Sequence, residues 1–287
     1  MDTEKNKVLG GTLYLVATPI GNLSDITERT LKVLSQVDFV AAEDTRNTGL
    51  LLSRFGISKP LVSYFEHNKR ERGEYIADRL LNGESCALVT DAGMPAISDP
   101  GEDLVVLCAE RGIPVTVVPG CCAAVTALVL SALPTGRFVF EGFLTTSKSD
   151  RHRRLEELAG ETRTMIFYEA PHKLRRTLSD MESAFGSQRR ITLCRELTKL
   201  NEETVRTTLG EAVKLYTEKE PRGEYVLVLE GAAAPKEANY PRDPREHVQM
   251  YIDSGMRKMD AIKAAARERG MPKALLYKEV LDDTKKE

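Results

Sequence analysis

The chain has 287 residues and a formal net charge of −2, from 41 Lys and Arg against 43 Asp and Glu. This length suffices for two compact domains with substantial cores. Hydrophobic residues make up 41% and charged residues 29%, a composition that excludes a disordered chain. The balanced charge means that any basic surface for nucleic acid must be local. With no apolar run of about 18 residues and no signal-peptide pattern, we expect a cytoplasmic protein.

Cysteines and histidines show no spacing typical of a disulfide framework or a metal site. The cysteines are an odd number without a C-x-x-C pair, and the histidines are scattered. We therefore expect small buried thiols and no metal. The residues concerned are Cys86, Cys108, Cys121, Cys122 and Cys194, with His67, His152, His172 and His247.

The first half of the chain alternates short β-branched runs with amphipathic stretches, a pattern typical of βαβ units. A helix is expected over Thr27–Gln36, with Asp25 as its N-cap, and Gly56, Gly83 and Gly112 are placed to end helices. The sequence thus predicts a parallel α/β domain at residues 12–134, after a flexible start at residues 1–11. The expected strands are Thr12–Ala17, Val37–Ala42, Pro60–Phe65, Ser85–Thr90 and Val115–Val118.

The alternation of β-branched runs and amphipathic stretches is interrupted near Pro134, and a second α/β domain is predicted at residues 135–231. A linker is expected at residues 232–240 from its Ala and Pro content. The tail at residues 241–287 reads as helical, with breaks at Gly255 and at Gly270–Pro272 and a helix-turn-helix spacing. In the second domain the expected strands are Arg137–Phe143, Thr162–Tyr168, Arg190–Arg195 and Glu224–Glu230, and the expected helices are Asp150–Leu158, His172–Phe185 and Glu211–Lys219.

Loops that follow the strands of an open parallel sheet are the first place to look for a ligand site. The first, Ala17–Leu23, lacks G-x-G-x-x-G, and no G-x-x-x-x-G-K-[ST] occurs anywhere, which counts against NAD enzymes and P-loop ATPases. The second, Thr90–Gly101, holds two Asp, two Pro and two Gly, as a preshaped ligand wall would. Its second half can also be a tight turn and a helix start at Asp99. The third, Val118–Ala123, brings small residues to a helix N-terminus.

These three loops, followed by Phe167–Leu174, Glu196–Lys199 with Glu202 and Glu203, and Gly223–Gly231, resemble the tetrapyrrole-methylase superfamily. The resemblance covers about Gly11 to Leu281, and within the superfamily it is to enzymes that 2'-O-methylate a cytidine ribose of 16S rRNA. It implies a two-domain α/β fold of the class III methyltransferases, with a parallel sheet, then a mixed sheet, and a small C-terminal helical domain. It also implies S-adenosyl-L-methionine in the cleft, a homodimer, and 16S rRNA within the 30S subunit as the partner.

The resemblance further implies which residues contact the cofactor, and all of them lie in the quoted motifs. Cys121 and Cys122 stand where relatives often have Ser, which weakens a hydrogen-bonding role for these side chains and leaves their backbone N–H groups available. The implied cofactor residues are Pro19, Thr90, Asp91, Ala92, Gly93, Met94, Ile97, Gly120, Cys121, Cys122, Tyr168, Leu197, Glu224 and Tyr225.

Methylation of a ribose hydroxyl needs a base or a stabilising cation near the methyl group. Two polar clusters at strand ends could supply it: Glu43, Asp44 and Arg46, and Glu169, His172 and Lys173. Each also has an ordinary explanation. Asp44 can cap the next helix, Glu169 can pair with an arginine, His172 can be an exposed helix residue, and Arg46 suits phosphate.

Three basic clusters could neutralise RNA phosphates, although solvated helix faces explain such runs equally well. Two alternatives to an rRNA methyltransferase stay open at this point: a methylase acting on a tetrapyrrole or other small molecule, and a non-catalytic RNA-binding module. The clusters are His67, Lys69, Arg70 and Arg72; Lys148, Arg151, His152, Arg153 and Arg154; and Lys173, Arg175 and Arg176.

Overall fold

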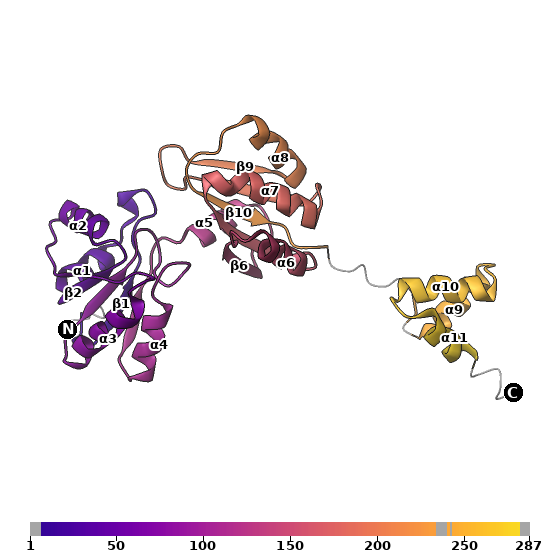
Figure 1. Cartoon of the computed structure of the whole chain (residues 1–287), viewed down its shortest axis with the longest axis horizontal. Helices are drawn as coiled ribbons and strands as arrows, with labels where there is room; N and C mark the ends of the chain where they lie inside the picture. Colours follow the sequence, from indigo (N-terminus) through magenta and orange to yellow (C-terminus); the bar gives the residue numbers. More distant parts are fainter. Residues whose placement is uncertain (1–6, 234–239, 242, 282–287) are drawn as a thin grey trace, which may run out of the picture. The chain divides into compact units, whose positions relative to one another are not determined.

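The structure is a computed structural model that describes residues 7–233, 240–241 and 243–281. Contacts within the chain divide it into two compact units, Met1–Ala232 and Ala233–Glu287 (Figure 1). Part of the predicted flexible start, residues 1–6, lies outside the described residues. So does most of the predicted linker, residues 234–239.

The first unit begins with a sheet of parallel strands in the order β3-β2-β4-β1-β5. Because every strand runs in the same direction, all the carboxyl ends meet at one edge. These strands match the five predicted from the sequence. They are β1 (Leu13–Val16), β2 (Phe39–Ala42), β3 (Leu61–Ser63), β4 (Cys86–Val89) and β5 (Val115–Val118).

Helices cover both faces of this sheet, which explains why β2 and β4 are buried along their whole length (Figure 1). The helices α1 (Glu28–Gln36) and α2 (Thr45–Arg54) pack on one face. The helices α3 (Lys69–Leu81) and α4 (Glu102–Glu110) pack on the other.

The N-cap predicted for α1 is wrong. Thr27 caps this helix by accepting a hydrogen bond from the Thr30 N–H, and Asp25 lies one turn earlier in a short 3-10 helix, Leu23–Asp25. A threonine directly before the first helical residue can reach that N–H, whereas Asp25 is too far along the chain. The helix-ending glycines are confirmed: Gly83, for example, follows α3 with φ of 90°.

The second sheet is mixed, in the order β6-β7-β10-β8-β9. The strands β6, β7 and β8 share one direction, and β10 runs against β7 and β8. The end of β7 and the end of β8 therefore meet the start of β10, at Tyr225. The strands are β6 (Phe138–Phe143), β7 (Thr164–Glu169), β8 (Arg190–Arg195), β9 (Glu203–Thr208) and β10 (Tyr225–Leu229).

Different helices also cover the two faces of the mixed sheet. One face packs against α6 (Lys148–Leu158), α7 (Pro171–Phe185) and α8 (Leu209–Glu218). The other packs against α5 (Ala123–Leu130), which follows β5, so a shared core joins the two halves of this unit. The edge strand β9 was missed by sequence reasoning because its residues, ETVRTT, are half exposed and lack an apolar alternation.

The second unit consists, within its described residues, of α9 (Pro244–Asp253), α10 (Lys258–Glu268) and α11 (Lys273–Leu281). Val248, Ile262 and Leu276 are among the side chains that form a core of its own. Across the described part of the chain, the structure contains no helix that is long and apolar enough to cross a membrane.

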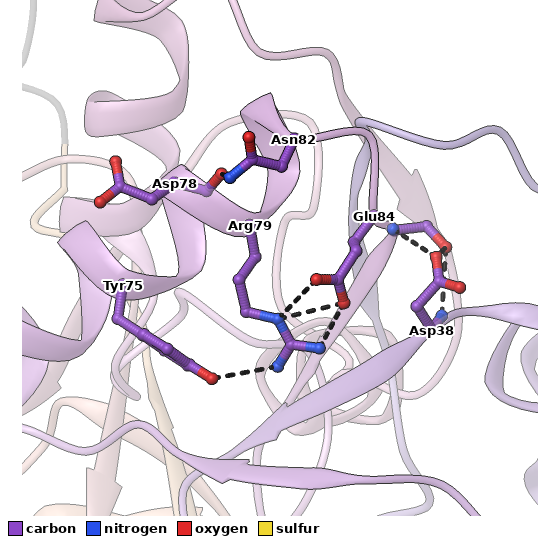
Figure 2. Close-up of polar contacts among 7 residues, drawn as sticks. Asp38, Tyr75, Asp78, Arg79, Asn82 and Glu84 are labelled. Carbon is purple, nitrogen blue, oxygen red and sulfur yellow. Dashed lines mark hydrogen bonds and ion pairs between the residues drawn. The ribbon is translucent and has the colours of Figure 1, made fainter.

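A polar network ties the end of α3 to the neighbouring strands of the first sheet (Figure 2). The Arg79 guanidinium donates to both carboxylate oxygens of Glu84, and its Cζ atom lies 3.6 Å from the centroid of the Phe39 ring. Beside it, the Asp38 carboxylate accepts from the backbone N–H and the hydroxyl of Ser85, each at 2.7 Å. These bonds lower the pKa of Asp38 and hold the start of β2 against β4.

We predict that Arg79→Ala lowers the free energy of unfolding by about 1–2 kcal/mol, because it removes both the ion pair and the cation–π contact. Urea denaturation measures the change. The matched control is Arg70→Ala, since Arg70 lies on the same helix, is exposed and forms no ion pair with any residue that the structure describes. Equal stability of the two variants would contradict the role given to Arg79.

Candidate functional site

A cavity of about 460 Å³ opens where the strand ends of both sheets of the first unit meet. The first sheet contributes the loops after β1, β2, β4 and β5, and the mixed sheet contributes the ends of β6, β7 and β8 and the start of β10. The lining residues are Ile20, Glu43, Asp91, Ala92, Gly93, Met94, Ile97, Ser98, Asp99, Cys122, Ala123, Phe143, Tyr168, Glu169, Ala170, Pro171, Cys194, Leu197, Lys199, Glu224, Tyr225 and Val226.

The wall supplied by the first sheet is held by contacts between its loops. Thr18 and Gly93 exchange backbone hydrogen bonds of 2.9 and 3.1 Å, which bind the loop after β1 to the loop after β4. Gly93 has φ of 87°, a conformation that a side chain would strain. Ala96 and Ser98 also have positive φ, 65° each, although both carry side chains. Strained backbone of this kind concentrates at ligand-binding sites.

The wall supplied by the mixed sheet is aromatic and apolar, with a polar rim. Tyr168 accepts a hydrogen bond from the Ala124 N–H at 3.2 Å, which joins β7 to the start of α5. Phe143 packs edge-on against the Tyr168 ring, with centroids 5.5 Å apart. At the rim, Lys199 donates to the carboxylates of Glu196 and Glu224 at 2.9 and 2.8 Å.

Three carboxylates face this cavity from adjacent strands of the first sheet: Glu43 after β2, and Asp91 and Asp99 in the loop after β4. Burial, followed by the negative charge of Asp91, raises the pKa of Glu43. Burial and the charge of Glu43 raise the pKa of Asp99 to about 6. The site therefore concentrates negative charge that a cationic ligand would offset.

A smaller cavity of about 310 Å³ adjoins the first, since Ile20, Asp91, Ala92, Lys199 and Glu224 line both. Thr90 lines the smaller cavity, is 2% exposed, and its hydroxyl interacts with the Asp99 carboxylate, which partly offsets the rise in the pKa of Asp99.

Most residues implied to contact the cofactor lie around these two cavities. Gly120 and Cys121 line neither one. Gly120 lies so close to β1 that a Cβ there would be 2.9 Å from the Ala17 Cβ, and the Cys121 thiol donates to the Asp25 carbonyl at 3.7 Å. Asp91, Ala92, Gly93, Met94, Ile97, Cys122, Tyr168, Leu197, Glu224 and Tyr225 line the larger cavity, and Pro19 and Thr90 the smaller.

The first catalytic cluster is divided by the structure. Glu43 lines the larger cavity, whereas Asp44 caps α2 by accepting from the Arg46 N–H at 2.8 Å. The Arg46 guanidinium pairs with the same carboxylate at 2.6 Å, which lowers the pKa of Asp44 to about 2. Of the two roles that the sequence allowed for Asp44, the structure therefore shows the helix cap.

The second catalytic cluster is divided in the same way. Glu169 lines the cavity, but it is 4% exposed and both carboxylate oxygens are occupied. One accepts from the Ala170 N–H at 2.8 Å and the other from the Thr177 hydroxyl, so Glu169 anchors the start of α7 rather than pairing with an arginine. His172 and Lys173 follow on α7 and do not line the cavity.

Sequence reasoning missed several lining residues. The sequence left Asp99 either in a ligand wall or at a helix start, and the structure places it in the loop before α4, which begins at Glu102, with its carboxyl lining the cavity. Its place in a loop rich in Asp and Pro was the available signal. Lys199 lies in the motif Glu196–Lys199, but the sequence analysis gave this residue no role. The other missed residues are Ile20, Ser98, Ala123, Phe143, Ala170, Pro171, Cys194 and Val226.

Many cations in the three predicted basic clusters are used in ion pairs. Those left without an ion pair among the described residues include Lys148, Lys173 and Arg176, at or near the starts of α6 and α7. The paired cations are Lys69 with Glu66 and Asp103, Arg151 and His152 with Asp180, Arg153 with Asp150, Arg154 with Glu141 and Glu157, and Arg175 with Glu220. No group of three or more metal-binding side chains occurs in the described residues.

Comparison with solved structures finds the same fold in two proteins of low sequence identity. A cobalt precorrin-4 methyltransferase superposes with a TM-score of 0.58 at 17% identity, covering 77% of this chain and 95% of that one. A uroporphyrin-III C-methyltransferase from Thermus thermophilus, complexed with S-adenyl homocysteine, gives a TM-score of 0.53 at 18% identity, covering 76% and 96%. These similarities confirm the predicted fold class.

Comparison of sequences is more specific. A protein of Halalkalibacterium halodurans named ribosomal RNA small subunit methyltransferase I is 50% identical over 93% of both chains. The protein of that name from Escherichia coli O157:H7 is 44% identical over 95% of both chains. The profile of the family described as Tetrapyrrole (Corrin/Porphyrin) Methylases matches residues 12–213. The chain therefore belongs to the tetrapyrrole methylase family, in the group formed with these small-subunit ribosomal RNA methyltransferases.

Proposed function

We propose that this protein uses S-adenosyl-L-methionine to methylate 16S rRNA of the small ribosomal subunit, and that the acceptor is the 2'-hydroxyl of a cytidine ribose. The relatives named above support the class of substrate. One observation carries the chemistry: a cavity at the strand ends of both sheets combines three carboxylates of the first sheet with apolar and aromatic side chains. We assign its two sides to domains at residues 12–134 and 135–231, and the tail at residues 241–287 to a third.

The residues of the cavity fit S-adenosylmethionine. This molecule supplies a methyl group on a sulfonium ion, and it also carries an ammonium group and an adenine. Asp91, Asp99 and Glu43 offset positive charge, and Met94 and Leu197 supply apolar surface. The two cavities together thus provide both kinds of contact that the molecule requires.

Asp99 is the residue best suited to activate the acceptor hydroxyl. It faces the cavity from a fixed loop, and its raised pKa of about 6 makes it a stronger base than an exposed carboxylate while leaving it ionised at neutral pH. It takes the hydroxyl proton as the ribose oxygen forms its bond to the methyl carbon. The carbon–sulfur bond breaks, and its electron pair remains on sulfur as a neutral thioether.

The RNA reaches this site past the starts of α6 and α7. Lys148 begins α6 directly after the loop that leaves Phe143, and Lys173 and Arg176 follow the lining residue Pro171 on α7. These cations form no ion pair with described residues and can neutralise phosphates. Arg46 is already paired with Asp44, so it is a weaker candidate for phosphate contact than the sequence suggested.

Methyl transfer can be tested directly with labelled S-adenosylmethionine and 30S particles that lack the modification. We expect label in 16S rRNA, recovered after alkaline digestion as a resistant dinucleotide, because a 2'-O-methyl group blocks cleavage. Protein-free 16S rRNA and a porphyrinoid serve as competing acceptors. Label in the porphyrinoid alone would establish the tetrapyrrole reaction, and absence of label despite cofactor binding would establish a non-catalytic module.

The role of Asp99 predicts a specific pH dependence. Because the base must be ionised, kcat/KM for RNA should rise as the pH increases through about 6 and level off above it. Asp99→Asn should lower kcat/KM by about 10²-fold or more and abolish that rise. Glu43→Gln is the comparison variant: it keeps Asp99 and should keep the rise, moved to lower pH because the charge that raises the pKa of Asp99 is gone. If Glu43→Gln removed the rise and Asp99→Asn kept it, Glu43 would be the base.

We also infer that the protein acts in the cytoplasm as a homodimer that meets its substrate within the 30S subunit. The support for a dimer is an apolar strip on α5, where Val125 is 48% exposed and Val129 is 71% exposed one turn later. Val125→Asp with Val129→Asp should convert the dimer to a monomer in sedimentation equilibrium. Thr126, on the same helix, provides the control Thr126→Ser, which should stay dimeric. A wild-type monomer would refute the inference.

A further inference from the structure

Acidic and basic residues are unevenly distributed along the second unit. Residues 243–256, which contain α9, hold Arg245 against Asp243, Glu246 and Asp253. Residues 257–281, which contain α10 and α11, hold seven Lys and Arg against three Asp and Glu. The unit is therefore acidic at its first helix and basic across the other two.

The interior of this unit is stabilised without those basic side chains, apart from Arg269. The Arg269 guanidinium donates to His247 Nδ1 at 3.1 Å and to the Asp243 carbonyl at 2.9 Å. It lies over the Tyr240 ring, which stacks on the buried His247 ring at 4.0 Å. Arg269 thus ties α10 to the start of α9 and is part of the fold.

The other basic side chains of residues 257–281 are exposed and form no ion pair with described residues. They are Arg257, Lys258, Lys263, Arg267, Lys273 and Lys278. In the first unit, by contrast, half of the residues in the basic clusters are paired with acidic neighbours. Six unpaired cations within 22 residues cost electrostatic repulsion that an anionic partner would relieve.

The arrangement of α10 and α11 suits a nucleic-acid backbone. The two helices are joined by the four residues Arg269–Pro272, and Gly270 in this turn has φ of 62°. On α11, Leu276 is buried in the core and Val280 packs against that core, while Leu275 is 51% and Tyr277 is 39% exposed, flanked by Lys273 and Lys278. An exposed aromatic ring between two cations is a surface that RNA can contact through phosphate and ribose.

We propose that α10, the turn and α11 form a second RNA-binding surface, which holds the ribose-phosphate backbone of the substrate RNA while the first unit performs methyl transfer. The proposal rests on the proposed rRNA substrate and adds to it a binding site separate from the catalytic cavity. It assigns Lys273 and Lys278 to phosphate contacts, with Lys263 and Arg267 extending the surface along α10.

The test uses the full-length chain with Lys273→Glu and Lys278→Glu combined. We expect KM for 30S particles to rise about tenfold, with kcat and the calorimetric affinity for S-adenosylmethionine unchanged. The slope of log affinity for protein-free 16S rRNA against log salt concentration should fall by up to about 2, because two phosphate contacts are lost. The conservative pair Lys273→Arg with Lys278→Arg should retain wild-type KM.

Two further variants control for net charge and for folding. Lys7→Glu with Arg54→Glu makes the same change of charge in the first unit. These residues lie before β1 and at the end of α2, at the edge of the first sheet opposite the carboxyl ends of its strands, so this variant should leave KM unchanged. If the α11 variant melts early, Lys263→Glu with Arg267→Glu on α10 tests the same surface, since both side chains are exposed and outside the core.

Each failure has its own signature. If wild type labels no RNA, the proposed function is wrong, whatever the variants do. If wild type labels RNA and both charge-reversal pairs keep its KM and salt slope, the second surface is refuted. If KM for 30S particles rises while affinity for protein-free 16S rRNA stays constant, the surface binds a ribosomal protein, which also overturns the proposal.

Discussion

The parallel pairing of β4 between β2 and β1 is the constraint on which the site depends. It places the loop after β4, with Asp91 and Asp99, beside Glu43 at the end of β2 and beside the loop after β1. Like charges accept this proximity only where burial is compensated. Part of that compensation lies within the site, since Asn47 donates to the Asp91 carboxylate at 2.9 Å and Lys199 lines the opposite wall. Binding and electrostatics are therefore set by strand order, before any single side chain is considered.

The fold was largely predictable because its signals are local. Short sequence patterns indicate strands flanked by turns and helices ended by glycines. The observed bounds of these elements differ from the expected ones by a few residues. The exceptions are instructive. The edge strand β9 has half-exposed, polar residues, and Thr27 replaced Asp25 as a cap because the helix starts later than expected. The position of this edge strand and the identity of this cap both depend on where the neighbouring elements end.

The site was less predictable because it depends on which groups find partners. The residues Glu43 and Asp44 are adjacent in sequence, yet one faces the cavity and the other caps α2. Glu169 lies in the cavity wall, but both of its carboxylate oxygens accept hydrogen bonds from the start of α7 and its first turns. Asp99 could belong to a ligand wall or to a helix start, and the sequence did not decide between them. Sequence supplies the candidates, whereas hydrogen bonds formed across the fold decide which candidates stay available for chemistry. The same holds for cations, since ion pairs neutralise many of those in the basic clusters.

The strained loops have a consequence for how this protein tolerates change. Ala96 and Ser98 on one side of the cavity, and Glu196 and Thr198 on the other, adopt positive φ although each has a side chain. Such conformations cost on the order of 1 kcal/mol or more each, and the surrounding packing must supply that energy. The scaffold is therefore less stable than its cores would allow. Selection for heat resistance alone would favour relaxing these loops, and would erode the shape of the cavity in doing so.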